Sequence, residues 1–165
     1  MKLKSTLFFL FLFSLLSCGN VPKNKAENKV VAIADGDTFT LLTADNKQQK
    51  IRLYGIDCPE RNQDFGTVAK QKLSELIFDH AVKIVQKDID RYGRMVALVY
   101  TDDNKCVNEE MLKSGLAWHY TEYDKNPYWD KLEDIAREQG IGLWKQKSPT
   151  PPWLWRKQKR GIQAK

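Results

Sequence analysis

Short runs of apolar residues, several of them alternating with polar ones, predict five β-strands in this chain of 165 residues. The Asp35-Gly36 and Asp45-Asn46 pairs that separate the first three runs are typical of tight turns, so these strands are predicted to form an antiparallel meander. A turn centred near Asp45-Asn46 pairs positions that sum to about 91, which places Asp37 opposite about Tyr54. The predicted strands are residues 30–34, 39–43, 50–54, 82–85 and 94–100.

Three further stretches have the three-to-four spacing of helices that bury one face. The first begins near Gly66 and buries Leu73 and Ile77. Asn108 is predicted to cap a second, short helix, and Asn126, which precedes a proline, to cap a third. Five strands and three helices in this order predict an α+β fold dominated by a five-stranded, closed oligonucleotide/oligosaccharide-binding (OB) barrel. A ferredoxin-like sandwich fits less well, because the first three strands have no helix between them.

The first residues of the chain have a pattern of their own. Lys2 and Lys4 precede an apolar run, residues 7–16, which contains one polar residue, Ser14, and is too short to cross about 30 Å of hydrocarbon as a helix. A positive flank followed by a short apolar segment is typical of an export signal. Residues 15–18 also resemble a bacterial lipoprotein signal, in which Cys18 is lipidated and anchors the protein in a membrane. Ordinary signal cleavage nearby, with Cys18 incidental, is the alternative.

These patterns divide the chain into four segments. The apolar content of 42% excludes wholesale disorder, and the length suits one compact domain with its own core. We expect an exported protein, either a lipoprotein of the cell envelope or a secreted one. The segments are a signal peptide of the lipoprotein type (1–17), a polar tether (18–28), the compact domain (29–147) and a basic tail with Pro and Trp (148–165).

Charge is distributed unevenly between the body and the tail. Residues 145–165 carry seven basic and no acidic side chains, whereas residues 18–144 carry 18 basic and 21 acidic ones. Such a tail can attract a polyanion such as nucleic acid, lie on anionic lipid, or only keep the protein soluble. Cys58 and Cys106 can form a disulfide in an oxidising compartment, but the sequence leaves this open.

Several charged residues are predicted to gather at the ends of the first strands. Asp37 and Asp57 offer hard oxygen ligands for calcium or magnesium, and Glu60 follows within reach of a metal-adjacent water as a general base. Arg52 and Arg94 can each bind two phosphate oxygens. Each residue alone also suits a turn or a surface ion pair, so the combination carries the interpretation as a phosphodiesterase.

Aromatic residues lie after the second helix. Trp118, Tyr120 and Tyr123 can stack on nucleic-acid bases, although aromatic residues near a helix junction more often belong to the core. His80 and His119 suit capping or packing better than base catalysis.

Taken together, the motifs resemble the staphylococcal nuclease (thermonuclease) family over about residues 29–156. The ending at residues 151–156 is similar to that of exported bacterial members. The matching blocks, in family order, are residues 35–38, 51–60, 90–94, 107–109, 115–117, 142–144 and 151–156.

This resemblance implies an OB barrel with three helices and a calcium-dependent endonuclease that cleaves DNA and RNA to leave 3′-phosphate ends. It implies that Asp37 and Asp57 bind Ca²⁺ through their carboxylates and Cys58 through its backbone carbonyl. Glu60 is implied as the general base. The implied phosphate-binding residues are Arg52 and Arg94, and those implied to approach the terminal nucleotide are Tyr120 and Tyr123.

Two departures from the family pattern stand out, a cysteine at position 58, where threonine or alanine is common, and a short loop at residues 61–65. Neither removes a catalytic group. A non-catalytic OB module that binds nucleic acid at the cell surface is the main alternative, and an envelope interaction protein that uses the Trp-rich tail is a third. All five charged residues of the constellation are present, which favours an enzyme. We also expect a monomer.

Overall fold

The computed structural model describes residues 28–163, so the predicted signal peptide, most of the tether and Cys18 lie outside the described residues. Among residues 28–163, no helix is long and apolar enough to cross a membrane. The elements are β1 (Lys29–Ile33), β2 (Thr38–Leu42), β3 (Gln48–Leu53), β4 (Ile56–Asp57), α1 (Gly66–Ile77), β5 (Lys83–Ile89), β6 (Met95–Tyr100), α2 (Val107–Lys113), β7 (Trp118–His119), α3 (Pro127–Glu138), the 3₁₀ helix η1 (Gly142–Lys145) and α4 (Pro152–Gln163).

The first three strands form the predicted antiparallel meander. Thr38 pairs with Arg52, and the backbone N–H of Leu53 donates to the carbonyl of Asp37 at 2.8 Å. Asp37 therefore lies opposite Leu53, one residue from the predicted register. The reason is the turn, which is closed by a hydrogen bond from Thr43 N to Lys47 O and is centred on Asp45 itself.

The main sheet has the strand order β1-β2-β3-β6-β5, in which β3 and β6 are parallel, and β4 pairs with β7 in a separate two-stranded sheet. The predicted closed barrel is wrong as stated. The edge strands approach each other where Lys29 bridges Ala81. Three backbone hydrogen bonds join the two segments there, from Val30 N to His80 O, from Asp79 N to Val30 O and from Val82 N to Asn28 O. The α+β class is confirmed, with an open five-stranded sheet whose two edges touch at one end.

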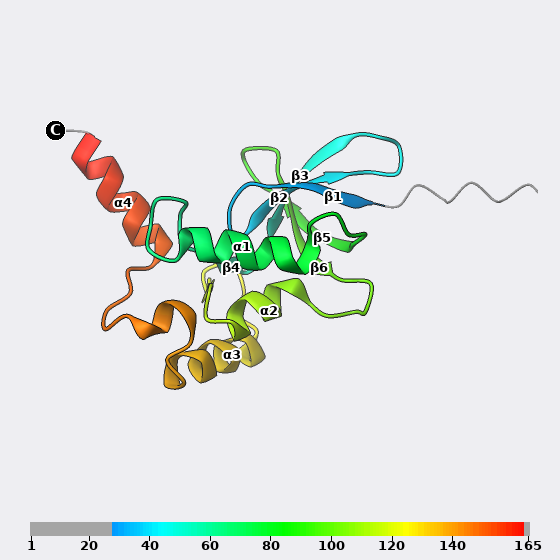
Figure 1. Ribbon diagram of the computed structural model, residues 1–165. Coiled ribbons are helices and arrows are strands. Elements are labelled where there is room, and N and C mark those ends of the chain that lie inside the picture. Colours follow the sequence, from blue (N-terminus) through cyan, green and yellow to red (C-terminus); the bar gives the residue numbers. More distant parts are fainter. Residues whose placement is uncertain (1–27, 164–165) are drawn as a thin grey trace, which may run out of the picture.

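Four α-helices are present among residues 28–163, where three were expected. α1, α2 and α3 are stacked on one side of the sheet, whereas α4 projects away from the body (Figure 1). The additional helix is α4, in the basic tail, where no helix was expected. It begins with Pro152, and a proline is favoured at the first helical position because its missing N–H has no partner there.

Asn108 has a different role from the predicted one. The cap of α2 is Cys106, and Asn108 is buried in the first turn of the helix. Its Oδ1 accepts from Val99 N at 3.1 Å, and its Nδ2 donates to the carbonyls of Tyr54 (2.9 Å) and Ala97 (3.3 Å). The side chain thus joins α2 to β6 and to the residue that follows β3. Asn126, in contrast, is confirmed as the cap of α3.

Candidate active site

Arg52 lies between two buried aspartates. Its Nη1 donates to Asp37 Oδ1 at 2.5 Å, and its Nη2 donates to Asp57 Oδ1 at 2.8 Å. Asp37 immediately precedes β2, Arg52 belongs to β3 and Asp57 ends β4, so the β2–β3 hairpin and the short strand after it bring the three side chains together. The sequence placed these residues near one another, and the structure joins them through one guanidinium.

Asp37 is held by two further contacts, one from the loop that follows β4 and one from the next residue, Thr38. Its Oδ2 accepts from Cys58 N at 3.0 Å, and its Oδ1 accepts from the Thr38 hydroxyl at 2.9 Å. Gly36 allows this close approach, because a Cβ there would lie 2.6 Å from Ala69 Cβ and 2.8 Å from Cys58 Cβ. The two loops are therefore pressed against each other and against α1, which fixes the position of the Asp37 carboxylate.

The two aspartates differ in how easily they ionise. Burial opposes ionisation of Asp37, but the charge of Arg52 and the hydrogen bonds from Cys58 and Thr38 keep the pKa of Asp37 below its ordinary value. Burial raises the pKa of Asp57, against the hydrogen bonds that it accepts from Arg156. Burial also opposes the charge of Arg52, yet the two carboxylates hold its pKa above the usual range. The pKa values of neighbouring carboxyl groups commonly differ in this way, since two negative charges close together repel each other.

Glu60 lies on the loop between β4 and α1. Its backbone N–H donates to Gln63 Oε1 at 3.1 Å, and its carbonyl accepts from Gln63 N at 2.9 Å. The loop closes tightly on the first residue of α1, because a Cβ on Gly66 would lie 2.0 Å from the Glu60 carbonyl oxygen. Only glycine permits this packing. The backbone at Glu60 is thereby fixed, while its side chain is 37% exposed and accessible to solvent.

Arg156, in the second turn of α4, connects Glu60 to the aspartates. Its Nη1 donates to Glu60 Oε1 at 2.7 Å and to Asp57 Oδ1 at 3.2 Å, and its Nη2 donates to Asp57 Oδ2 at 2.8 Å. Burial opposes its charge, but these bonds hold the pKa of Arg156 above the usual range. The site therefore continues from Asp37 through Arg52, Asp57 and Arg156 to Glu60.

Arg94 borders this group from the turn between β5 and β6. Its Nε donates to Asp90 Oδ2 at 2.7 Å, and its Nη1 donates to the Thr38 hydroxyl at 3.4 Å. Thr38 in turn donates to Asp37. Arg94 is therefore next to the aspartates, as predicted, but its charge is paired with Asp90.

The two predicted tyrosines lie together after β7. The rings of Tyr120 and Tyr123 meet edge to face at 4.9 Å between centroids, and Tyr123 is 64% exposed. Tyr120 also stacks flat on Trp153 of α4, with centroids 5.1 Å apart and planes 4° from parallel. Trp118 is buried and belongs to the core. His119 is buried between Asp124 and Asp130, which agrees with a packing role.

Both cysteines in the described part of the chain are free, so the pairing that the sequence left open is not formed. Cys58 is buried and its thiol donates to the Gly36 carbonyl at 3.3 Å. Burial raises the pKa of Cys58 well above its ordinary value, so the thiol stays neutral and is a poor metal ligand. The backbone of Cys58 is the part that faces Asp37.

Asp35 is a neighbour of Asp37 that the sequence reasoning missed as a site residue. Its Oδ1 accepts from the Asp37 backbone N–H at 3.1 Å. Burial and the charge of Asp37 raise the pKa of Asp35 to about 7. The only advance signal was its place in the Asp-Gly-Asp turn. Arg156 was also missed, because nothing in the sequence relates the tail to a loop almost a hundred residues earlier.

The raised pKa of Asp35 leads to a prediction for stability. In the presence of chelator, the free energy of unfolding should fall as the pH rises from about 4 to about 7, because the folded state retains a proton there that the unfolded chain has released. The Asp35→Asn variant should lose this part of the pH dependence, whereas Asp102→Asn, in an exposed turn, should keep it. Urea unfolding at several pH values measures both. Equal pH profiles for the parent and Asp35→Asn would contradict the assignment.

Comparison with known proteins identifies the family. The chain matches the family model "Staphylococcal nuclease homologue" over residues 50–146. It is 41% identical over 151 residues to a Haemophilus influenzae protein named "Uncharacterized endonuclease", which covers 92% of this chain and 83% of the relative. It is 37% identical over 140 residues to a Shigella flexneri protein named "Micrococcal nuclease", over 78% of this chain and 79% of the relative. The chain belongs to the staphylococcal nuclease family.

Proposed function

We propose that this protein is a calcium-dependent, nonspecific endonuclease that hydrolyses phosphodiester bonds of DNA and RNA and leaves 3′-phosphate ends. The observation that carries the proposal is the chain of contacts in which Arg52 bridges Asp37 and Asp57 while Glu60 lies beside the same Asp57 through Arg156. The relatives named endonuclease and micrococcal nuclease support it. We also retain as proposals a monomeric state, export, and anchoring in a membrane through Cys18, which rest on the sequence alone.

The donor groups fit a calcium ion by their chemistry. Asp37 and Asp57 present carboxylate oxygens, which hard divalent cations prefer. Three carboxylates, those of Asp37, Asp57 and Glu60, face two guanidinium groups here, and Asp35, whose pKa is raised to about 7, lies beside Asp37. The carboxylates therefore outnumber the guanidinium groups, which suits a cation. Within the described residues no three His, Cys, Asp or Glu side chains form a metal-binding group. The two aspartates and the Cys58 carbonyl would therefore share the ion with water and substrate oxygens.

The proposed reaction assigns separate tasks to the side chains. Bound calcium would neutralise charge on the phosphate. Glu60 accepts a proton from the attacking water, whose oxygen then bonds to phosphorus as the bond to the 5′ oxygen breaks. The 5′ oxygen takes up a proton from solvent water, and Glu60 releases its proton to solvent. Arg52 uses at most three of its five N–H donors within the protein, so at least two remain for phosphate oxygens. Arg94 likewise retains donors beyond those given to Asp90 and Thr38.

Cleavage by the purified chain tests the proposal against the alternative of a binding module. We expect single-stranded DNA and RNA to be cut with calcium and left intact with chelator, and the products to carry 3′-phosphate ends. A phosphatase that removes phosphate from those ends should make them substrates for extension by a polymerase. If the protein retains single-stranded DNA on a filter but does not cut it under either condition, the non-catalytic OB module is the better assignment.

A further inference from the structure

We propose that α4 is a substrate-binding arm, which receives the polynucleotide strand where it leaves the proposed catalytic centre. The inference rests on the proposed function and extends it to a surface outside the group of aspartates. Four features carry it. They are the attachment of the first turn of α4, the position of Arg156, the basic residues that follow it, and the opposite charge of the body.

The beginning of α4 is fixed beside the site. Trp153 stacks on Tyr120 and meets Trp118 edge to face, with centroids 6.4 Å apart. Gln63 donates from Nε2 to the Thr150 carbonyl at 2.5 Å while its Oε1 accepts from Glu60 N. One glutamine side chain therefore joins the loop of the proposed base to the segment that leads into α4. These contacts fix the start of α4 next to the proposed catalytic residues.

Arg156 connects α4 to the carboxylates of the proposed site. Its guanidinium contacts both Asp57 and Glu60, and its side chain is 37% exposed, so it lies at the mouth of the site and faces solvent in part. Residues three and four positions apart share one face of a helix. Lys159 and Arg160 follow Arg156 at these intervals, so a row of three basic side chains runs outward from the site.

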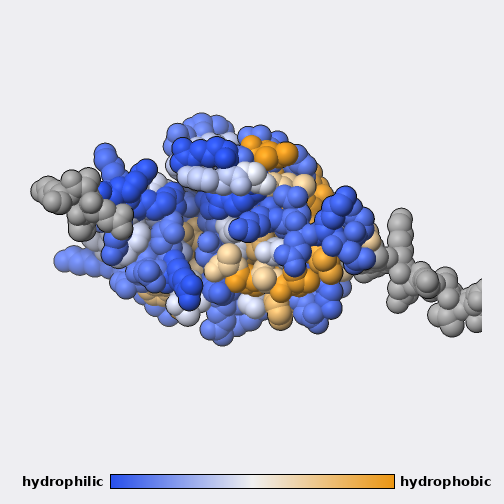
Figure 2. Space-filling view, turned by 90° about the horizontal axis from the view of Figure 1, so that it is seen from above, coloured by the Kyte–Doolittle hydropathy of each residue, from blue (hydrophilic) through white to orange (hydrophobic). Residues whose placement is uncertain are grey.

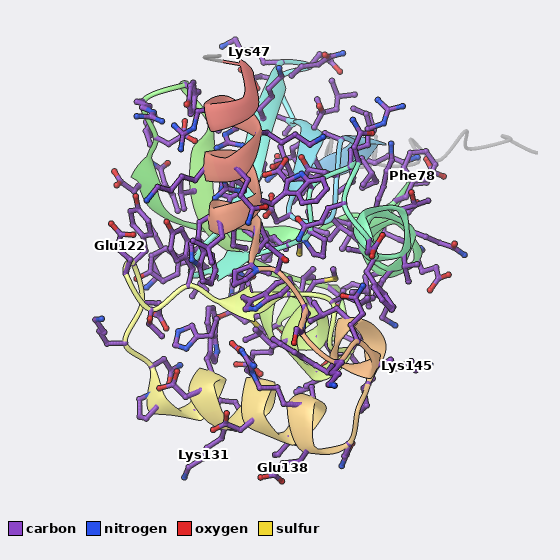
Figure 3. All side chains as sticks on the ribbon, turned by 90° about the vertical axis from the view of Figure 1, so that its left-hand side faces the viewer. Lys47, Phe78, Glu122, Lys131, Glu138 and Lys145 are labelled. Carbon is purple, nitrogen blue, oxygen red and sulfur yellow. The ribbon has the colours of Figure 1, made fainter. Side chains whose placement is uncertain are left out.

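The outer part of this row is available to a ligand. Lys159 and Arg160, which form the outer part of the row, are exposed, and so is the adjacent Lys157. Within the described residues, the ion pairs of α4 are those that Arg156 makes. Figure 2 shows hydrophilic side chains beside the grey C-terminal residues, and Figure 3 shows α4 rising past the sheet, on the side away from α3. Lys159 lies over the ring of Trp155 at 5.0 Å, so an aromatic side chain lies next to the row.

Charge complementarity indicates which class of ligand binds to α4. Residues 18–144 carry three more acidic than basic side chains, whereas residues 145–165 carry seven basic and no acidic ones. A body of net negative charge repels a polyanion at long range, and the tail carries an uncompensated group of basic side chains that can attract a strand toward the site. Basic residues next to aromatic ones suit a single strand without sequence preference. The occupant is therefore a single-stranded polynucleotide.

The test compares two double variants in a Cys18→Ser background, which removes any lipid anchor. One is Lys159→Gln/Arg160→Gln. The matched control is Lys105→Gln/Lys131→Gln, which removes the same charge from exposed side chains away from α4. Binding of a labelled oligothymidylate of about 20 nucleotides is followed by fluorescence anisotropy in chelator. The readout is binding and needs no calcium, so the result does not depend on whether the protein is a nuclease.

We expect the α4 variant to bind on the order of tenfold more weakly at 0.1 M salt, and the slope of log K against log salt to become about 1.4 shallower, because two phosphate contacts are lost. The control variant should bind like the parent. Equal affinity and slope in all three proteins would overturn the proposal. So would unchanged oligonucleotide binding together with lost binding to vesicles of equal parts phosphatidylglycerol and phosphatidylcholine, which would identify α4 as a membrane-surface helix.

Discussion

Glu60→Gln is expected to lower the rate of single-stranded DNA cleavage in calcium by at least about 10²-fold, the lower range for loss of a general base. Glutamine has the same shape, and its Oε1 can still accept from Arg156, so the contacts of the loop are retained. What is lost is the ability to take a proton from water. Initial rates at saturating substrate measure the effect.

The matched control is Glu138→Gln, at the outer end of α3, where the side chain points away from the sheet (Figure 3). It should cleave like the parent. Glu60 is 37% exposed, so its replacement should leave the unfolding temperature nearly unchanged, which separates a chemical effect from a structural one. A Glu60→Gln protein that retains its rate within a few-fold would show that another group accepts the proton.

Arg52→Met should lower the free energy of unfolding by about 3–5 kcal/mol, because removal of this guanidinium leaves the buried Asp37 without a counter-ion. Asp57 is fully buried and Asp37 nearly so, and both accept from Arg52 through Oδ1, but Asp57 retains its second partner, Arg156. The loss should shrink as the pH falls. Without Arg52 the pKa of Asp37 rises above that of the unfolded chain and the already raised pKa of Asp57 rises further, so the folded state binds more protons and gains stability on acidification.

Arg94→Met is the matched control, with the same chemical change at the other proposed phosphate-binding residue. The Arg94–Asp90 pair is partly exposed at both side chains, so its loss should cost no more than about 1 kcal/mol. Chemical unfolding in chelator at neutral and at acidic pH compares the two variants. Equal losses, or a loss in Arg52→Met that does not depend on pH, would contradict the account of Arg52 as the counter-ion of both aspartates.

The sequence predicted well those parts of the site that lie close together in the chain. Asp37, Arg52 and Asp57 belong to one hairpin and the strand after it, and turn residues determine which positions of a hairpin face each other. The one-residue error in register arose because the turn is centred on Asp45, a detail that the turn residues alone do not decide. Short-range pairing rules were sufficient here.

Contacts between distant segments were not predictable in this way. The hydrogen bonds of Asn108 reach Tyr54, 54 positions earlier, and a local rule that favours asparagine at helix caps gave the wrong role. The bridge between Lys29 and Ala81 depends on how the sheet curves, so the sequence could not show that its edges meet only at one end. The partners of Arg156 lie in a loop that no periodic pattern connects to the tail.

The separation of these ion pairs along the chain also sets an order in which they can form. Asp37 and Arg52 are 15 positions apart, whereas Arg156 is 99 positions from Asp57. Short loops close at a smaller entropic cost than long ones. We therefore expect the aspartates to meet Arg52 first during folding, and α4 to dock onto ion pairs that already exist.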